Sequence, residues 1–218
     1  MDRSEPVNIS GLELKPISGI EGECFQFRLP NVALFGSSFD PPHVGHTRAC
    51  MVASELCDQL LVCPTTQNPM KARSCASFDH RLEMSRLFAE EMGWGLWDQG
   101  HATTAELLHS HGKTIKNQTQ SVVVGMDTMN TIQHWHDFND IFKSTKTIVI
   151  SRPGYDIEKH CQHLPSWFLE NMTIVCCETV NISSTKLRQL IAQKDDTLVE
   201  KYLSPNVLEY IRDNSLYC

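Results

Sequence analysis

The sequence predicts an α/β fold in which one doubly wound parallel sheet carries helices on both faces. Two short apolar runs, at Asn31–Phe35 and Gln59–Pro64, flank a stretch of helix formers from Thr47 to Leu56. Further apolar or β-branched runs follow at Ser121–Gly125, Thr147–Ile150 and Met172–Cys177. Strands that alternate with helices form parallel sheets, and such sheets bind ligands at the carboxyl ends of their strands.

The composition fits one intracellular globular domain. The chain has 218 residues, of which 41% are hydrophobic and 21% charged. Residues 1–30 show neither a helical nor a strand period, so we expect an N-terminal extension there and a single domain with C-terminal helices over residues 31–218. A net charge of −7 argues against a broad nucleic-acid surface. We expect no membrane span and a cytoplasmic location, because the chain has no signal-peptide segment and no run of about 18 apolar residues.

One short run joins a strand end, a turn, two prolines and two histidines. Residues 36–38 predict a loop whose backbone can approach a ligand closely. The two prolines that follow suit the first turn of a helix that begins near Val44. His43 and His46 are three residues apart, so both imidazoles can face one ligand beside the positive end of the helix macrodipole. Gly45 keeps that face open.

The histidine pair has other interpretations, which the wider run helps to weigh. Such a pair can be two surface histidines, or half of a zinc site that needs a third Cys, His, Asp or Glu ligand. The whole run from Gly36 to His46 resembles the G-[GT]-[ST]-F-[DN]-P-x-H-x-G-H signature of the nucleotidyltransferase superfamily, whose members transfer adenylyl or cytidylyl groups. Ser37 stands where many members have glycine.

The loop from Thr65 to Ser77 falls at the carboxyl end of the second strand, and long loops there are often functional. Lys71 is a candidate phosphate ligand in this loop, and a solvated basic loop is the alternative. The resemblance supports the phosphate role, because nicotinate mononucleotide adenylyltransferases have an N/P-P-x-K element here. The helix predicted over Phe78–Met92 contains their R-L-E-M run and is expected to serve mainly in packing.

The resemblance is weak over His101–Leu107. A short strand is predicted near residues 93–98 and a helix over Thr103–His111. The family usually has S-Y-T-x-D-T-L around this point, which contributes to the pyridine nucleotide pocket. Only Thr103 and Leu107 correspond, so the identity of the acceptor stays open.

Three residues in the middle of the chain are candidate acceptor ligands. Asp127 follows the strand that ends at Gly125, where a helix is predicted to begin, and it can bind a ribose hydroxyl or cap that helix. Trp135 can stack on a pyridine or purine ring, worth roughly 1–3 kcal/mol, or pack in the core. Arg152, in an S-R-P-G-Y turn that the family shares, can meet phosphate or solvent. The segment around Asp127 and Trp135 also resembles the family's G-x-D-x-L…W pattern.

A second chemical stretch runs from Ile182 to Arg188. Ser183 is predicted to cap a helix whose first turn contains Lys186, followed by Arg188, and no acidic residue. Cations there oppose the macrodipole by about 0.3–1 kcal/mol each, so a negative ligand is expected to compensate them. A Ser/Thr-rich cap with incidental basic residues is the alternative. Residues 182–188 resemble I-S-S-T-x-x-R, the second signature of the superfamily. The resemblance implies that this stretch binds the triphosphate.

The resemblance covers roughly residues 31–217, because Tyr202–Tyr217 also matches the Y-L-x-P-x-V-x-x-Y-I…L-Y tail of nicotinate mononucleotide adenylyltransferases. It implies a Rossmann-like nucleotidyltransferase fold and an enzyme of NAD biosynthesis that moves AMP from Mg²⁺-bound ATP to nicotinate mononucleotide, giving deamido-NAD and pyrophosphate. The catalytic residues assigned on this basis are His43, His46, Lys71 and Arg188. The ATP ligands are Gly36, Ser37, Ser38, Phe39, His43, Gly45, His46, Ile182, Ser183, Ser184, Thr185 and Arg188. The acceptor ligands are Lys71, Thr103, Asp127, Trp135 and Arg152, and no protein ligand to a metal is expected.

Other functions remain open at this point. The acceptor could instead be nicotinamide mononucleotide or pantetheine phosphate, although the long tail argues against the latter. A nucleotide-binding module without turnover is a different class, and the intact His43, His46 and Arg188 argue against it. A metal-binding protein that uses the ten histidines is a third reading. The sequence leaves open whether the chain forms a homo-oligomer.

Overall fold

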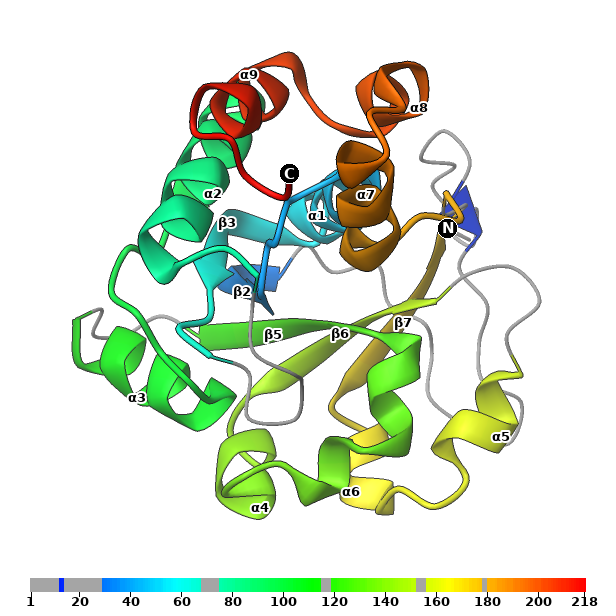
Figure 1. Cartoon of the computed structure of the whole chain (residues 1–218). Helices are drawn as coiled ribbons and strands as arrows, with labels where there is room; N and C mark the ends of the chain where they lie inside the picture. The colour runs from blue at the N-terminus through cyan, green and yellow to red at the C-terminus, as the bar shows by residue number, and fades with distance from the viewer. Residues whose placement is uncertain (1–11, 14–28, 68–74, 115–118, 152–155, 178–179) are drawn as a thin grey trace, which may run out of the picture.

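The computed structural model describes residues 12–13, 29–67, 75–114, 119–151, 156–177 and 180–218. These residues form one seven-stranded sheet between two layers of helices (Figure 1). The strands are β1 (Leu12–Glu13), β2 (Leu29–Ser37), β3 (Cys57–Pro64), β4 (Gly95–Leu96), β5 (Thr119–Gly125), β6 (Lys146–Ser151) and β7 (Met172–Cys177). Their order is β1-β7-β6-β5-β2-β3-β4, and every pair is parallel except β1 with β7. The predicted doubly wound α/β fold is confirmed.

The helices divide between the two faces of the sheet. The upper face in Figure 1 is covered by α1 (Val44–Ser54), α2 (Phe78–Met92), α7 (Ser184–Ala192), α8 (Asp196–Tyr202) and α9 (Pro205–Asp213). The lower face is covered by α3 (Thr104–Thr114), α4 (Phe138–Phe142), α5 (Ile157–Cys161) and α6 (Ser166–Leu169), with the 3₁₀ helices η1 (Met126–Asn130) and η2 (Ile132–His134). The expected C-terminal helices therefore belong to the layer that also contains α1.

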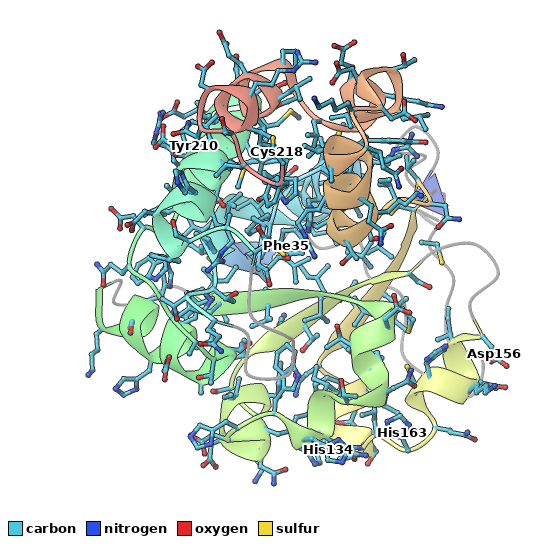
Figure 2. The ribbon with its side chains drawn as sticks, in the orientation of Figure 1. Phe35, His134, Asp156, His163, Tyr210 and Cys218 are labelled. Carbon is cyan, nitrogen blue, oxygen red and sulfur yellow. The ribbon has the colours of Figure 1, made fainter. Side chains whose placement is uncertain are left out.

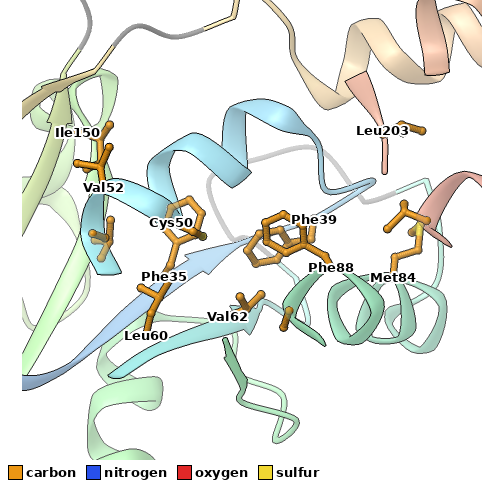
Figure 3. Close-up of a cluster of buried hydrophobic side chains, with 14 of the residues drawn as sticks. Phe35, Phe39, Cys50, Val52, Leu60, Val62, Met84, Phe88, Ile150 and Leu203 are labelled. Atoms are coloured by element: carbon orange, nitrogen blue, oxygen red, sulfur yellow. The ribbon is translucent and has the colours of Figure 1, made fainter. Parts of the chain in front are cut away.

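Each face of the sheet packs its own hydrophobic core, because successive strand residues point to opposite faces. In β2, Ala33 and Phe35 pack under α1 and α2, whereas Val32 and Leu34 join the core on the other face. Figure 3 shows the first of these cores, where Phe35 lies near the fully buried Phe39. Their rings meet edge to face with centroids 5.7 Å apart, so the start of the loop after β2 is anchored in the core.

The strand order reverses between β2 and β5, and this reversal opens a ligand site at the carboxyl ends of the two strands. β2 continues into α1 on one face, and β5 continues into η1 on the other. The residues that follow Ser37 and Gly125 therefore meet at one edge of the sheet.

Most predicted elements are confirmed, and two details are wrong. α2 spans the predicted residues, and α1 begins at Val44 as the prolines indicated. Gly36 and Ser37 are not loop residues, because β2 continues through them and pairs them with the last two residues of β3. The helix expected directly after β5 is instead two short 3₁₀ turns, since Thr131 leaves helical geometry with φ −128°.

Parts of residues 1–30, expected as an extension, lie in the sheet. Leu12 and Glu13 pair antiparallel with Cys177 and Cys176 of β7, and β2 begins at Leu29. The sheet therefore draws on residues before 31. The remainder of 1–30 lies outside the described residues, and the proposed domain boundary stays a prediction.

Candidate active site

The start of α1 fixes both histidines of the first motif. His43 is the N-cap residue, and its Nδ1 accepts a hydrogen bond from the backbone N–H of Gly45 at 3.1 Å. His46 Nδ1 accepts from the backbone N–H of His43 at 3.2 Å. The two side chains thus form a reciprocal capping box, with ring centroids 4.0 Å apart.

These bonds determine where each neutral imidazole holds its proton. Because both Nδ1 atoms accept backbone N–H groups, the proton of each ring is assigned to Nε2. His43 is 9% exposed, and burial lowers its pKa to about 4, so it is neutral at pH 7. The Nε2 atom of His46 lies 3.3 Å from the Ser37 hydroxyl. Two N–H donors therefore stand at the carboxyl end of β2.

Gly45 is required by the closeness of the His43 ring. A Cβ atom on Gly45 would stand 2.9 Å from His43 Cε1 and 3.0 Å from His43 Nδ1, distances that side chains do not adopt. The same Cβ would lie 4.0 Å from Cγ2 of Ile182, a residue of the second motif. The His43 ring is therefore what requires glycine here, since the distance to Ile182 is an ordinary van der Waals contact.

The second motif forms the start of α7. The Ser183 side chain caps the helix by accepting from the backbone N–H of Lys186 at 3.2 Å. The first turn has no acidic residue, as the sequence indicated. Arg188 Nη2 donates to Thr185 Oγ1 at 3.2 Å, which holds the guanidinium along the helix. The positive helix end and a fixed guanidinium make a site suited to phosphate groups.

Two hydrogen bonds join the motifs across about 145 residues of sequence. The Ser184 hydroxyl donates to the carbonyl of Pro41 at 2.9 Å. Arg188 Nη1 donates to the carbonyl of Asp40 at 2.7 Å. The peptide bond between Asp40 and Pro41 is cis. The starts of α1 and α7 are thus joined directly by hydrogen bonds, which brings the two motifs together.

Asp40 is a residue whose structural importance sequence reasoning missed. Its side chain is 4% exposed, and the carboxylate accepts from the backbone N–H groups of Cys75 at 2.8 Å and Ala76 at 3.2 Å. It also accepts from the Tyr217 hydroxyl at 2.7 Å. The signature contains this aspartate and the tail pattern contains this tyrosine, but nothing in either pattern indicates that they meet.

Arg81 supports the same edge of the sheet from α2. It is 1% exposed and donates to the carbonyls of Ser38 at 2.9 Å, Thr65 at 2.6 Å and Thr66 at 2.6 Å. A weaker bond reaches the carbonyl of Ala76 at 3.3 Å. Burial lowers the pKa of the guanidinium, and the charge of Asp40 opposes that shift. Arg81 therefore ties together the loops that follow β2 and β3.

Three predicted acceptor ligands lie in segments that flank β5 along the chain, Thr103 before it and Asp127 and Trp135 after it, and these segments are called the β5 side of the site. The Thr103 hydroxyl accepts from the backbone N–H of Glu106 at 3.2 Å and so caps α3. Asp127 is exposed and is the second residue of η1, whose N-cap is Gly125, so its alternative role as a helix cap is wrong. Trp135 is half-buried, with its ring centroid 6.2 Å from that of Phe142. Two further predicted residues, Lys71 and Arg152, lie outside the described residues.

His101 precedes Thr103 on the β5 side of the site and pairs with Thr65, the residue that follows β3. Its Nε2 would be 3.8 Å from a Cβ on Gly36, and the ring is 5% exposed. Burial lowers its pKa to about 4, while the charge of Glu106 opposes the shift. Its Nδ1 is buried with no hydrogen-bond partner among the described residues. A neutral imidazole therefore stands where the sequence departs from the family pattern.

Comparison with known proteins identifies the fold and the family. A cytidylyltransferase-like family profile matches residues 34–190, a span that includes both motifs. A probable nicotinate-nucleotide adenylyltransferase from Chlorobaculum parvum is 30% identical over 199 residues, which cover 84% of this chain and 97% of the relative. This chain belongs to the nicotinate-nucleotide adenylyltransferase family.

A second relative and a solved structure are also similar to this chain. A probable nicotinate-nucleotide adenylyltransferase from Prosthecochloris aestuarii is 28% identical over 85% of this chain and 97% of its own length. Among solved structures, the nicotinic acid mononucleotide adenylyltransferase of Plasmodium falciparum complexed with NaAD superposes with a TM-score of 0.69. That structure shares 20% sequence identity over 86% of this chain and 97% of its own, so the likeness establishes the fold.

The metal-binding alternative and the question of a membrane span can both be examined in the described residues. Among the described residues, no group of three or more His, Cys, Asp or Glu side chains is placed to hold a metal ion. The described helices also include none long and apolar enough to cross a membrane. The cytoplasmic location and the oligomeric state stay predictions.

Proposed function

We propose that this member of the family transfers the adenylyl group of ATP to nicotinate mononucleotide, forming deamido-NAD and releasing pyrophosphate. The observation that carries the proposal is the convergence of two helix starts, tied by Ser184 to Pro41 and by Arg188 to Asp40. An anionic ligand between them would meet two positive helix ends and the Arg188 guanidinium. The family of the chain and the names of its relatives support the same reaction.

The reaction needs alignment and charge neutralisation more than a base. The acceptor phosphate is mostly dianionic near neutral pH, because its second pKa is about 6. One of its oxygens attacks the α-phosphorus of ATP, and the bond from that phosphorus to the bridging oxygen of pyrophosphate breaks. Negative charge on the α-phosphate oxygens then has to be stabilised while the reactants stay in line.

His43 and His46 meet this requirement with neutral donors. Both Nε2–H groups are held by backbone bonds at the opposite ring nitrogen, so neither ring needs to reorient during the reaction. We assign both groups to the α-phosphate oxygens, at the N-terminus of α1. Gly36, Ser37, Ser38, Phe39 and Gly45 shape the backbone around this position.

The start of α7 receives the β- and γ-phosphates. We assign them to Ser183, Ser184, Thr185 and Arg188, together with Ile182 as the apolar contact to Gly45 and Lys71 from the loop after β3. Asp40 is poorly placed to bind a metal, because its buried carboxylate already accepts from two N–H groups and one hydroxyl. Mg²⁺ is therefore expected to arrive with ATP and to neutralise its phosphate oxygens with few protein ligands.

The acceptor occupies the β5 side of the site. We assign Trp135 to the pyridine ring, Asp127 to a ribose hydroxyl, and Thr103, Arg152 and Lys71 to polar groups of the acceptor. His101 stands where the family pattern is lost, so nicotinamide mononucleotide is the second candidate acceptor. An imidazole with an unpaired nitrogen can hydrogen-bond either a carboxylate or a carboxamide.

The test is pyrophosphate release from ATP and Mg²⁺ with each pyridine mononucleotide supplied separately, and with His46→Ala as the blank. We expect release with nicotinate mononucleotide in the native protein and almost none in the variant. A larger kcat/KM for nicotinamide mononucleotide would move the assignment to the second acceptor. No release with either acceptor, while ATP still binds, would contradict the proposed reaction.

A further inference from the structure

The penultimate residue of the chain reaches into the candidate active site. The Tyr217 hydroxyl donates a hydrogen bond to Asp40 Oδ1 at 2.7 Å, across 177 positions of sequence. Figure 1 shows the C-terminus between α2 and α7, beside the end of β2. None of the roles assigned above uses this tyrosine, so its bond to a motif residue needs an explanation.

The C-terminal tail is held in a defined conformation after α9. Ser215 and Tyr217 have φ values of 50° and 65°, a region that residues other than glycine rarely adopt. Such conformations persist where surrounding contacts stabilise them. The backbone N–H of Leu216 donates to the carbonyl of Ile211 at 3.0 Å, and the side chains of Leu216 and Tyr217 pack against the core under α2. The tail is thus docked, and it delivers the phenol to Asp40.

Asp40 connects this tail to the groups that would bind ATP. Its carboxylate accepts from Cys75 and Ala76, which follow Lys71 in the loop after β3, and from Tyr217. Its main-chain carbonyl accepts from Arg188 Nη1 at 2.7 Å, and Oδ2 lies 3.8 Å from the same nitrogen. The side chain and the carbonyl of one residue thus link the tail to Arg188.

The Tyr217 hydroxyl is suited to hold Asp40, because it stays protonated and can always donate a hydrogen bond. Burial raises the pKa of Tyr217, and the adjacent charge of Asp40 raises it further. The hydroxyl thus keeps its proton over the working range of pH. A carboxylate only accepts hydrogen bonds, so each bond to Asp40 needs a donor on its partner. Tyr217 supplies one of the three donors, and two backbone N–H groups supply the others.

We propose that Tyr217 is a positioning residue for adenylyl transfer, which holds Asp40 so that Arg188 is aimed at the phosphates of ATP. The chemical part of this inference rests on the proposed function. Its effect on ATP affinity requires only that Arg188 meets ATP. The C-terminal tail is therefore part of the site, although it contacts no substrate.

The chain offers a matched control in Tyr210 of α9. Its hydroxyl shares a hydrogen bond of 2.9 Å with His80 Nδ1 on α2, and it too is partly buried. Figure 2 labels Tyr210 on α9, and Cys218 at the end of the tail. Tyr210→Phe and Tyr217→Phe remove the same atom from the same end of the chain, but only the second removal reaches Asp40.

The experiment measures the affinity for α,β-methylene ATP in full-length protein, with thermal unfolding as a check on folding. We expect Tyr217→Phe to weaken binding about tenfold, because a misaimed Arg188 loses part of a charge-assisted hydrogen bond to the phosphates, and Tyr210→Phe to change it less than twofold. Both variants should unfold within a few degrees of the native protein. Equal affinities in the two variants would overturn the proposal.

A double-mutant cycle then tests the route through Arg188. In an Arg188→Ala background, Tyr217→Phe is expected to change the affinity less than twofold, because the side chain through which it acts is gone. A full tenfold effect in that background would show that Tyr217 acts by another route and would contradict the positioning role. If the native protein turned over neither pyridine mononucleotide, the proposed function would fail, while these affinity measurements would still decide the role of Tyr217.

Discussion

The two sides of the site differ in how their polar groups are used. On the β2 side, hydrogen bonds fix His43 and His46 at Nδ1 and Arg188 at both Nη atoms, at the starts of α1 and α7. On the β5 side, the Thr103 hydroxyl already caps a helix and Trp135 packs partly into the core. The side proposed to bind phosphate is thus pre-organised by bonds between the two motifs, whereas the described residues proposed to bind the acceptor are held by a helix cap and by the core.

The match of the sequence to the family pattern also differs between these two sides of the site. Both superfamily signatures fall on the side proposed to bind the phosphates, and the stretch His101–Leu107, where the family pattern is lost, belongs to the side proposed to bind the acceptor. Because every member must stabilise the same charge on ATP, the phosphate side is constrained by the reaction. The acceptor side is constrained only by the molecule it selects. We infer that the first side sets the rate and the second sets the choice of acceptor.

The largest expected effect is on the phosphate side. His46→Ala removes a donor aimed at developing charge, so we expect kcat to fall about 10³-fold, with the dissociation constant of ATP within about threefold of native. Steady-state kinetics and equilibrium binding of α,β-methylene ATP check this. An equal loss in kcat and in ATP affinity would mean that His46 serves ground-state binding.

The second prediction concerns pH and compares one buried histidine from each side. His43 and His101 both have a pKa of about 4 when folded, against about 6.5 in an unfolded chain. Protonation therefore favours the unfolded chain. Each buried neutral histidine thus contributes to the free energy of unfolding. Its contribution is fully present above pH 6.5 and is lost as the pH falls through about 4, by about 2 kcal/mol per histidine between pH 7.5 and 4.5.

Urea unfolding at a series of pH values measures this loss. His101→Gln should remove its own share of the pH dependence, leaving a shallower profile than the native one. A profile unchanged by the substitution would show that His101 is accessible to protons when folded. His43 would then stand alone as a buried neutral imidazole, and the comparison between the sides would weaken.

The third prediction tests how tightly the phosphate side is packed. Gly45→Ala would push the His43 ring away from its cap position, so we expect kcat to fall by roughly ten- to a hundredfold. Gly112→Ala in α3 is the control, since its Cβ would meet only Gln120 at 3.5 Å, an ordinary contact. Native activity in Gly45→Ala would show that the position of His43 is not critical.

The smallest expected effect is on the acceptor side. Trp135→Leu should raise KM for the pyridine mononucleotide about tenfold, the loss expected for one stacked ring, and leave KM for ATP unchanged. Trp167→Leu is the control, because Trp167 is also half-buried in the same core, with its ring 5.4 Å from that of Phe138. If both variants changed KM alike, Trp135 would be a core residue only.

The fold and the ends of its helices could be predicted because they depend on local rules. The prolines before His43 and the serine before α7 mark helix starts within a few residues, and apolar runs mark the strands. The contacts of Asp40 with Tyr217 and of Arg81 with Thr65 could not be predicted. They join residues far apart in sequence, and nothing in the residue types indicates the partner.

The most direct test of the division between rate and choice is one ratio, kcat/KM for nicotinate mononucleotide over kcat/KM for nicotinamide mononucleotide. It should be measured in the native protein, in Gly45→Ala and in Trp135→Leu. We predict that Gly45→Ala lowers both values equally and leaves the ratio native, whereas Trp135→Leu changes the ratio. A ratio that moves in Gly45→Ala and stays constant in Trp135→Leu would contradict the account.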